Sequence, residues 1–538
     1  MKKYLLFLLL LFYCFNVFSQ QDAWVYLVDK QNVSSAVSNP ISILTQKAIN
    51  RKNSHGVVID ARDVPVNESY VSQLKNASGI TVMAKSKWLN AIHVRGSEIA
   101  IKNLTSSFSF IDYIDFADKS LNDFKRVKEK KQSKLESILT SFNYGSAANQ
   151  IQMFKGEQLH LANYTGSGMT VAVLDAGFPN VNSMAGFQRL RNANNIKGTY
   201  NFVNRNSNVY TNTTSNHGTL VLSTMAGYVE NQYVGTAPDA SYYLFITEDA
   251  PNENPVEESY WVEAAERADS LGVDIINTSL GYTTYDNPNY SYSPSQMNGN
   301  TAFITRGANI AFEKGMLLVN SAGNSGNDSW GIVGAPADAA GVLSVGAVTS
   351  AGLYASFSSR GNSLQPTRKP DVVAQGQASI VITENNVIAS ANGTSFSSPI
   401  LAGGIVCLWQ ALPSLKNSEI MQLVRESASQ YATPDYYLGY GIPNLQMALN
   451  SGIALTDAES NTEVKLYPNP ASFKAYIKIP LTEESVSVLI FDVLGKLVSS
   501  TAITPLNNEV DLLSLSNGLY LVTLKSKNIS QTIKLIKQ

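Results

Sequence analysis

The stretch VAVLDAG at residues 171–177 is a continuous apolar run that ends on a carboxylate and a glycine. Such a run is typical of a strand that is buried on both faces, as strands are in a parallel sheet. Further buried strands are expected at residues 242–246, 273–277 and 316–320, with helical periodicity at residues 255–271 and 301–314. Strands that alternate with helices predict an α/β domain with a mostly parallel sheet, and this pattern covers residues 144–450.

The composition limits the number of domains and the kinds of partner. The 538 residues are 44% hydrophobic and 15% charged, with a formal net charge of −2. This length suggests about three or four domains, with ample apolar material for their cores. A near-neutral charge balance offers no broad basic face, which argues against a nucleic acid partner.

Residues 1–19 are predicted to be a signal peptide. Two lysines precede an apolar run at residues 4–18, and small residues suit cleavage just before Gln20. The alternative is a membrane anchor, but about 15 apolar residues are short for a span of about 20. No later segment is apolar for long enough to cross a bilayer, so the mature chain is expected to be secreted without a membrane span.

The chain has two cysteines, Cys14 and Cys407. Cys14 would leave with the signal peptide, so the mature protein is expected to have no intramolecular disulfide. Its stability must then come from core burial or from bound ions.

Two further units flank the α/β domain. Residues 20–123 contain short strands and helices, enough for a small α+β unit. A linker at residues 124–143 carries a run of charges, which indicates a solvated helix or an exposed boundary open to proteolysis. Over residues 457–538 short strands recur between turn signals, which predicts a β-sandwich.

Two polar side chains are expected at the same edge of the parallel sheet. Asp175 ends a buried strand, and His217 opens an apolar helix. The reactive edge of an α/β sheet is the carboxyl end of its strands, where Asp175 could bond one ring nitrogen of His217 and fix its tautomer. Each residue alone could equally be a satisfied polar group. His160 is interpreted as a surface or packing residue.

A nucleophile and an amide donor follow along the chain. Ser395 lies in NGTSFSSP, residues 392–399, ahead of an apolar helix whose N-terminus favours developing negative charge. The simpler interpretation of such a serine is an N-cap. Asn324 lies in SAGNSG, residues 321–326, where its amide could donate to an oxyanion or merely stabilise a turn.

Together these segments resemble the three active-site motifs of the subtilase family. VLDAG at residues 173–177, NHGT at 216–219 and NGTSFSSP at 392–399 occur in the family's Asp, His, Ser order. VGTAPDA at 234–240 and DIINTSLG at 274–281 also resemble segments of that family. The resemblance covers residues 144–450 and implies a subtilisin-like serine endopeptidase acting on protein or peptide substrates.

The resemblance also implies a role for each site residue. Ser395 would attack the scissile carbonyl, His217 would transfer the proton, Asp175 would orient His217, and Asn324 would donate to the oxyanion. Substrate would pair with Ser279, Leu280 and Gly281 as an added strand. Ser321, Ala322 and Gly323 would line the pocket for the residue before the scissile bond.

No cofactor is expected for the chemistry, and no metal ligand is assigned. Many subtilases hold structural calcium in loops. Asp and Asn cluster at residues 285–287 and 324–328, but neither cluster has clear ligand spacing, so both are interpreted as solvated loops.

Two features depart from the family pattern. Ala176 follows the catalytic Asp175 where the family usually has Thr or Ser, so a hydroxyl next to the triad is lost. Residues 283–300 form an insert rich in Tyr, Asn, Ser and Pro, which is predicted to be a surface loop. The alternative is that the insert shapes substrate specificity, because it follows residues 274–281, which resemble the strand of the family's substrate cleft.

The flanking units carry their own resemblances. Residues 20–123 are similar in position and size to a subtilase propeptide, which implies a zymogen that is inhibited until the linker is cut. LYPNP at residues 466–470, IFDVLGK at 490–496 and NGLYLV at 517–522 resemble the C-terminal sorting domain of the type IX secretion system. That unit would engage the export machinery; the alternative is a sugar- or substrate-binding module.

Two functional classes remain open at this point. One is an active secreted endopeptidase, and the other is an inactive relative that serves as a binding or structural module. The presence of all four catalytic groups favours the enzyme.

Overall fold

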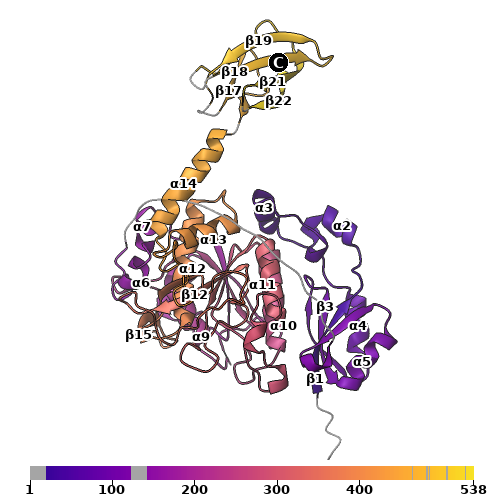
Figure 1. Ribbon diagram of the computed structural model, residues 1–538, viewed down its shortest axis with the longest axis vertical. Coiled ribbons are helices and arrows are strands. Elements are labelled where there is room, and N and C mark those ends of the chain that lie inside the picture. The colour runs from indigo at the N-terminus through magenta and orange to yellow at the C-terminus, as the bar shows by residue number, and fades with distance from the viewer. Residues whose placement is uncertain are drawn as a thin grey trace, which may run out of the picture. The chain divides into compact units, whose positions relative to one another are not determined.

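The computed structural model describes residues 20–122, 142–211, 213–462, 464–479, 483, 485–504, 507–527 and 529–538. Contacts divide the chain into two units, Met1–Gly452 and Ile453–Gln538, and Figure 1 shows their elements. The predicted signal peptide and residues 124–141 of the predicted linker lie outside the described residues.

A seven-stranded parallel sheet forms the centre of the first unit, as the sequence predicted. Its strand order is β13-β12-β11-β10-β5-β9-β6. The strands in chain order are β5 (Thr170–Asp175), β6 (Ile196–Asn201), β9 (Ser241–Ile246), β10 (Ile275–Thr278), β11 (Leu317–Ser321), β12 (Val342–Val348) and β13 (Val372–Gln375).

Helices cover both faces of this sheet. Alternate residues of each strand point to opposite faces, so each strand contributes to two cores. Val171 and Val173 of β5 belong to the core that also contains α9 (His217–Ala226) and α12 (Thr394–Ala411). Ala172 and Leu174 belong to the core that contains α10 (Val256–Leu271) and α11 (Phe303–Glu313). A strand buried on both sides must be apolar at every position, which explains its continuous apolar sequence.

Shorter elements complete this part of the first unit. The helices are α6 (Ala148–Gln152), α7 (Gly156–Leu161), α8 (Gln188–Asn192) and α13 (Asn417–Glu426). Two short antiparallel ribbons consist of β7 (Tyr228–Val229) with β8 (Tyr233–Val234), and β14 (Ser379–Ile382) with β15 (Ile388–Ala391).

The N-terminal part of the first unit is an α+β structure, as predicted. Its antiparallel sheet has the order β2-β3-β1-β4, and one face packs on two helices. The elements are β1 (Gln20–Leu27), α4 (Glu68–Lys75), β2 (Ile80–Ser86), β3 (Ala91–Ser97), α5 (Glu98–Ser107) and β4 (Ile111–Phe116). Residues 28–67, which include α2 (Val33–Ser38) and α3 (Gln46–Ser54), are inserted between β1 and α4.

The insert at residues 283–300 lies at the surface, as the sequence predicted, but it is also anchored by buried side chains. Tyr285, Tyr292 and Met297 are buried, and both tyrosine hydroxyls donate to Glu258 Oε1 at 2.6 Å. The other oxygen of Glu258 accepts the N–H of Ile304 near the start of α11 at 2.9 Å. The insert is therefore held by a buried carboxylate on α10, a long-range contact that local composition does not reveal.

The second unit is a sandwich of two antiparallel sheets with one apolar core. One sheet contains β16 (Lys465–Tyr467), β17 (Lys474–Lys478) and β20 (Glu509–Asp511). The other contains β18 (Val486–Asp492), β19 (Leu497–Ile503), β21 (Gly518–Lys525) and β22 (Ser530–Lys537).

The predicted domain boundary between residues 450 and 457 falls inside helix α14 (Leu445–Thr462). Leu445, Ala448 and Leu449 are buried, whereas residues 453 and 454 are exposed. The helical backbone therefore continues beyond the apolar pattern from which the boundary was predicted.

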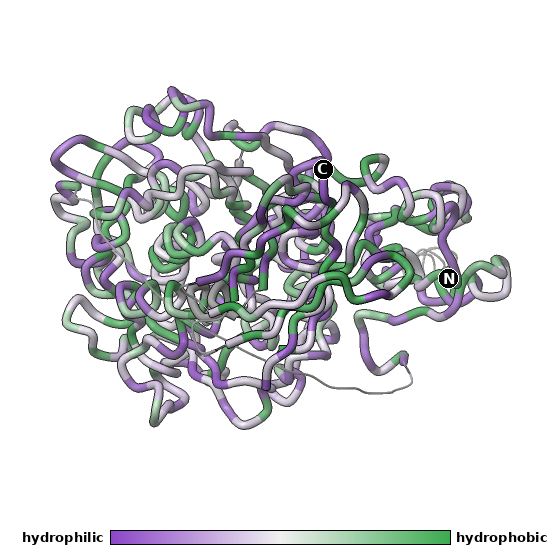
Figure 2. Tube along the Cα trace, turned by 90° about the horizontal axis from the view of Figure 1, so that it is seen from above, coloured by the Kyte–Doolittle hydropathy of each residue, from purple (hydrophilic) through white to green (hydrophobic). Residues whose placement is uncertain are grey.

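Hydrophobic segments of the chain are short. Figure 2 shows hydrophobic stretches interrupted by hydrophilic residues along the trace. Across the parts of the chain that the structure describes, none of the helices is both long and apolar enough to cross a membrane.

Candidate active site

The structure brings Asp175 and His217 together at the carboxyl edge of the parallel sheet. Asp175 is the last residue of β5 and is fully buried, and His217 is the first residue of α9. His217 Nδ1 lies 2.8 Å from Asp175 Oδ1. A carboxylate accepts, so Nδ1 carries the proton and Nε2 is left as a proton acceptor.

The pKa of His217 is raised above its ordinary value of 6.5. Burial by itself favours the neutral ring, but the charge and hydrogen bond of Asp175 outweigh it, with a smaller contribution from Glu248. The site is thus arranged to stabilise an imidazolium when His217 takes a proton.

The oxygens of Asp175 differ in their partners. Oδ1 also accepts the N–H of Ala176 at 2.7 Å. Oδ2 is buried, and no partner for it exists among the residues that the structure describes. This orphaned oxygen lies next to the position where the resemblance predicted a missing hydroxyl.

Ser395 lies in the first turn of α12, on the same edge of the sheet. Its Oγ is 3.4 Å from the carbonyl oxygen of Ser279, a long contact that leaves the hydroxyl able to rotate. The ring of Phe396, the next residue, has its centroid 6.2 Å from that of His217. The helix that carries the serine therefore meets the helix that carries the histidine.

Pro399 explains how Ser395 is tied to the neighbouring strand. The proline lies inside α12 and has no N–H, so the Ser395 carbonyl loses its usual partner four residues later. The hydroxyl of Ser279 donates to that carbonyl instead, at 2.9 Å. Pro399 lies deep enough in α12 to free this carbonyl for the segment that follows β10.

Asn324 is fixed with its amide nitrogen available. Its Oδ1 accepts the backbone N–H of Thr394 at 2.9 Å and the Thr394 hydroxyl at 3.0 Å. A side chain on Gly393 would lie 3.6 Å from Asn324 Nδ2, so the glycine keeps the space in front of that nitrogen clear. An oriented N–H next to the N-terminus of α12 is suited to a developing oxyanion.

A cavity of about 160 Å³ opens beside Ser395. Its lining includes the two predicted substrate-binding segments, 279–281 and 321–323, together with Asn324 and Gly334. Beyond Thr278 the chain leaves the sheet, and residues 279–281 run along the cavity. All the substrate-binding residues predicted from the sequence thus surround one cavity.

Sequence reasoning missed Asn277. It is buried in β10, its Oδ1 accepts the hydroxyl of Ser398 at 3.0 Å, and its Nδ2 donates to Ser279 Oγ at 3.4 Å. Asn277 therefore joins the cleft strand to α12. A polar residue at the end of an otherwise apolar strand was the available signal.

Three carboxylates, one of which lies close enough to act on Asp175 and His217, were also missed. Glu248, Glu253 and Glu257 have oxygens within 4.8 Å of one another, and among the described residues they are the only such group of three possible metal ligands. Glu248 Oε2 accepts the hydroxyl of Tyr282 at 2.7 Å. Burial raises the pKa of Glu248 to about 7 and that of Glu257 to about 9.

His160 is a packing residue, in line with one of its predicted roles. It is fully buried, with Nδ1 2.8 Å from the Tyr144 hydroxyl and Nε2 3.0 Å from the Thr236 carbonyl. Burial lowers its pKa to about 4, so the ring is neutral. Cys407 is buried and free.

Three family models match this chain. Residues 166–441 match the subtilase family, residues 22–136 match the peptidase S8 propeptide domain of Bacteroidota, and residues 465–538 match a secretion system C-terminal sorting domain.

Similar proteins of known identity are subtilisins. Subtilisin E of Bacillus subtilis (strain 168) is 31% identical over 343 residues, which is 62% of this chain and 81% of that protein. The subtilisin of Bacillus pumilus is 31% identical over 300 residues, 55% of this chain and 97% of that protein. A crystal structure of MycP1 without its N-terminal propeptide is 20% identical, with a TM-score of 0.45, and covers 56% of this chain and 96% of that one.

Proposed function

Because the chain belongs to the subtilase family, we propose that Asp175, His217 and Ser395 are the catalytic triad of this secreted serine endopeptidase. The observation that carries the proposal is the 2.8 Å contact between His217 Nδ1 and Asp175 Oδ1 at the sheet edge where α12 begins. The enzyme hydrolyses peptide bonds and is made with a propeptide.

The proposed reaction starts at the Ser395 hydroxyl. Its oxygen attacks the scissile carbonyl while His217 Nε2 takes its proton, and Asp175 holds the ring and stabilises the imidazolium. His217 then gives that proton to the leaving amine as the peptide bond breaks, which leaves an acyl-enzyme. Water attacks the acyl group by the same route, His217 returns the proton to Ser395, and the acid product leaves.

Oxyanion stabilisation is assigned to two donors. Asn324 Nδ2 is oriented by the two bonds that its oxygen accepts from Thr394. The first N–H groups of α12 have no acceptor within the helix, and that of Ser395 is the second donor. Such preorganised donors act where charge develops and need no rearrangement during the reaction.

Substrate binding is assigned to the two segments that line the cavity. Residues 279–281 leave the sheet and offer backbone groups with which an extended peptide can pair. Ser321, Ala322 and Gly323 line the adjacent wall, which would receive the side chain before the scissile bond. No cofactor is assigned to the chemistry, and structural calcium stays a prediction without an assigned site.

Hydrolysis of a denatured protein by the processed enzyme tests this proposal. We expect cleavage that is abolished by Ser395→Ala and by a serine-directed inhibitor, with the label on Ser395. The control is Ser397→Ala, two residues further along the same helix, where the hydroxyl bonds only its own turn at Thr394 O. If pure processed protein cleaves nothing and is not labelled, the alternative of an inactive binding module is correct.

Self-processing is the expected route to the mature enzyme. We propose a cut between residues 124 and 143 that separates the leader, residues 20–123, from the catalytic unit. The Ser395→Ala protein should then accumulate with the leader attached. Normal trimming of that mutant, in the absence of other proteases, would show that another enzyme makes the cut.

The C-terminal sorting domain marks the chain for secretion or cell-surface export. We propose that it passes the protein across the outer membrane after the signal peptide has been removed. Deletion of residues 465–538 should retain the protein in the periplasm. Normal export with weaker substrate binding would instead favour a binding module.

A further inference from the structure

The leader touches the catalytic part of the chain far from the candidate active site, through its inserted segment, residues 28–67. Lys47 Nζ donates to Asp274 Oδ2 at 2.9 Å, and Asp274 precedes β10. Lys47 also bonds the hydroxyl of Thr170, the first residue of β5. Asp175 ends the same strand about 17 Å further on, at about 3.3 Å per residue. The segment therefore lies at the sheet edge opposite to the triad.

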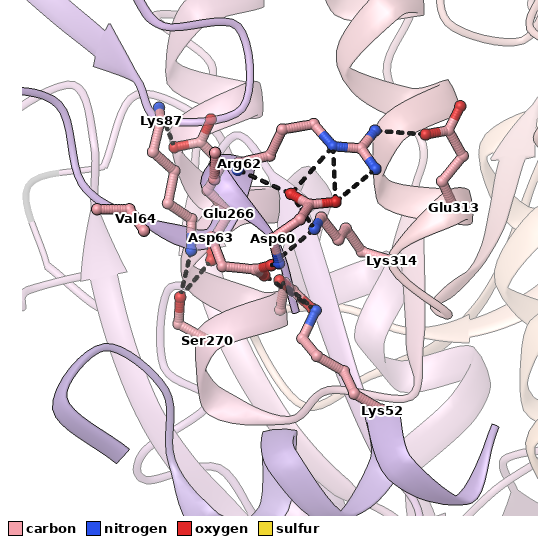
Figure 3. A network of polar contacts seen from close by, with 12 residues as sticks. Lys52, Asp60, Arg62, Asp63, Val64, Lys87, Glu266, Ser270, Glu313 and Lys314 are labelled. Carbon is pink, nitrogen blue, oxygen red and sulfur yellow. Dashed lines mark hydrogen bonds and ion pairs between the residues drawn. The ribbon is translucent and has the colours of Figure 1, made fainter. Parts of the chain in front are cut away.

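Two reciprocal ion pairs hold this segment. Lys52 of the leader lies 2.8 Å from Asp269 at the end of α10, and Asp63 of the leader lies 2.7 Å from Lys314 just after α11. Lys52 and Asp63 also pair with each other at 3.2 Å. Figure 3 shows Lys52, Asp63 and Lys314 in one network. The four side chains are between 0 and 1% exposed, so neither pair is screened by solvent.

The network is neutral as a whole. More exposed groups extend it: Arg62 bonds Asp60 and Glu313, Arg51 bonds Asp269, and Lys314 also lies 3.0 Å from Asp60. Four cations then face four carboxylates, and each side of the interface supplies both signs. The set is Arg51, Lys52, Arg62 and Lys314 with Asp60, Asp63, Asp269 and Glu313.

The loop that presents Asp63 is held by hydrogen bonds within the leader itself. The N–H of Asp60 donates to Asp63 Oδ2 at 2.8 Å. Lys30 Nζ donates to the carbonyls of Ala61, Val64 and Lys87 at 2.6–2.7 Å, which joins the loop to the leader sheet. A preorganised loop loses little conformational freedom on binding.

The rest of the leader binds α10 separately. Glu266 accepts the backbone N–H groups of Lys87 and Trp88 at 3.0 and 2.9 Å. A cavity of about 390 Å³ lies between this contact and the inserted segment, with Asp63, Lys87 and Glu266 in its lining. The inserted segment also contacts α12, where the ring of His55 stacks on that of Trp409 with the centroids 5.5 Å apart. The inserted segment is thus a second attachment with partners of its own.

We propose that residues 28–67 are a clamp by which the catalytic unit recognises its own leader and retains it after the linker is cut. Recognition depends on reciprocal charge, Lys52 with Asp269 and Asp63 with Lys314. The contacts lie away from the cut, so cleavage between residues 124 and 143 leaves them intact. Replacing one charged member of this neutral network leaves it with one uncompensated buried charge, so a leader without the matching charges is rejected.

Neutral pH favours retention. Burial alone would raise the pKa of Asp63, but Lys52 and Lys314 outweigh it and hold that pKa below its ordinary value of 3.8. The complex therefore keeps this contribution above about pH 3.8 and loses it as the pH falls further. This inference rests on the proposed role of the leader as the propeptide.

The test uses the full chain with Ser395→Ala, so that no self-digestion occurs, and a recognition site for an added sequence-specific protease within residues 124–141. After the cut at neutral pH, gel filtration and the dissociation rate report whether the leader stays. Without other changes we expect retention as a one-to-one complex. Lys52→Met should raise the dissociation constant about a hundredfold or more. Lys52→Arg, which keeps the cation between Asp63 and Asp269, should lose far less.

The matched control is Lys102→Met in the same leader, whose exposed ion pair with Glu98 does not involve the catalytic unit; it should leave the rate unchanged. If Lys52→Met does not fold, Glu313→Gln at the exposed end of the network carries the test, with release about two- to fivefold faster. Immediate loss of the unaltered leader, or unchanged retention in Lys52→Met or, if that variant does not fold, in Glu313→Gln, would overturn the clamp. Neither readout needs catalysis, so the proposed enzymatic function stands or fails separately.

Discussion

His217 Nδ1 lies 2.8 Å from Asp175 Oδ1, while Oδ2 of the same buried carboxylate has no hydrogen-bond partner among the described residues. One oxygen therefore orients the catalytic ring, and the other is unsatisfied. A buried polar atom without a partner costs about 1–3 kcal/mol, more for a charged group. The residue that could have supplied a donor, at position 176, is alanine.

A hydroxyl at position 176 should stabilise the protein. In Ala176→Ser the new Oγ–H can donate to Asp175 Oδ2, and we expect the free energy of unfolding to rise by about 1–2 kcal/mol. Urea denaturation of the Ser395→Ala background, which cannot digest itself, measures it. Ala176→Cys is the control of similar size, because a thiol is a weak donor. Equal stability of the serine and cysteine variants would mean that Oδ2 gains no bond.

Asp175→Asn should disable the triad without unfolding the site. The amide N–H can donate a hydrogen bond to an unprotonated Nδ1 and so stabilise the wrong tautomer, in which Nε2 carries the proton and cannot act as a base. Substitution of this aspartate in serine proteases costs about 10⁴-fold in kcat, and we expect a loss of that order here. Single-turnover cleavage of a peptide substrate measures it. Retention of more than a tenth of the activity would contradict the role of Asp175.

Asn324→Ala should lower kcat with little change in KM. Its Nδ2 is assigned to the oxyanion, which forms only in the transition state, so ground-state binding is spared. The loss of one such donor costs about 10²–10³-fold in kcat. Asn327→Ala, a neighbouring amide that bonds the Ser356 hydroxyl at 3.2 Å, is the control. A change confined to KM would assign Asn324 to substrate binding instead.

Glu248 should contribute to the position of the acid limb of the pH–activity profile. Catalysis needs neutral His217, so kcat/KM falls as the pH drops through the His217 pKa, which lies above 6.5. The Glu248 carboxylate stabilises the imidazolium, so Glu248→Gln should move that limb to lower pH. Burial raises the pKa of Glu248 itself to about 7, and its charge is complete only above that value. Glu253→Gln is the comparison, since Glu253 does not act on His217; equal shifts would refute the assignment.

Ser279 and Pro399 should be coupled. Ser279→Ala leaves the Ser395 carbonyl without a donor, because Pro399 cannot supply its N–H, and we expect a loss of about 1–2 kcal/mol in stability. Pro399→Ala restores an N–H four residues after Ser395. In the double variant the Ser279 effect should shrink to less than half. A double-mutant cycle by denaturant unfolding measures the coupling, and additive effects would argue against it.

The sequence was sufficient for the architecture, and its motifs named the four residues proposed to carry the chemistry. Continuous apolar strands alternating with helices predicted the parallel sheet, which the structure confirms. Short motifs around Asp175, His217, Asn324 and Ser395 pointed to one chemistry, because each motif combines a reactive group with the local turn or helix end that presents it. Such information is local, and a single chain carries it.

The tertiary structure alone decided which distant residues supply the hydrogen-bond partners and counter-charges of buried groups. Tyr285 and Tyr292 anchor the insert because Glu258 accepts their hydroxyls, and Ser395 is tied to Ser279 because Pro399 frees a carbonyl. Lys52 and Asp269 are 217 residues apart, and nothing in either local sequence shows that they pair. Burial of a polar or charged group is tolerated only where a partner satisfies it, and that partner is chosen by the fold rather than by its neighbours in the chain.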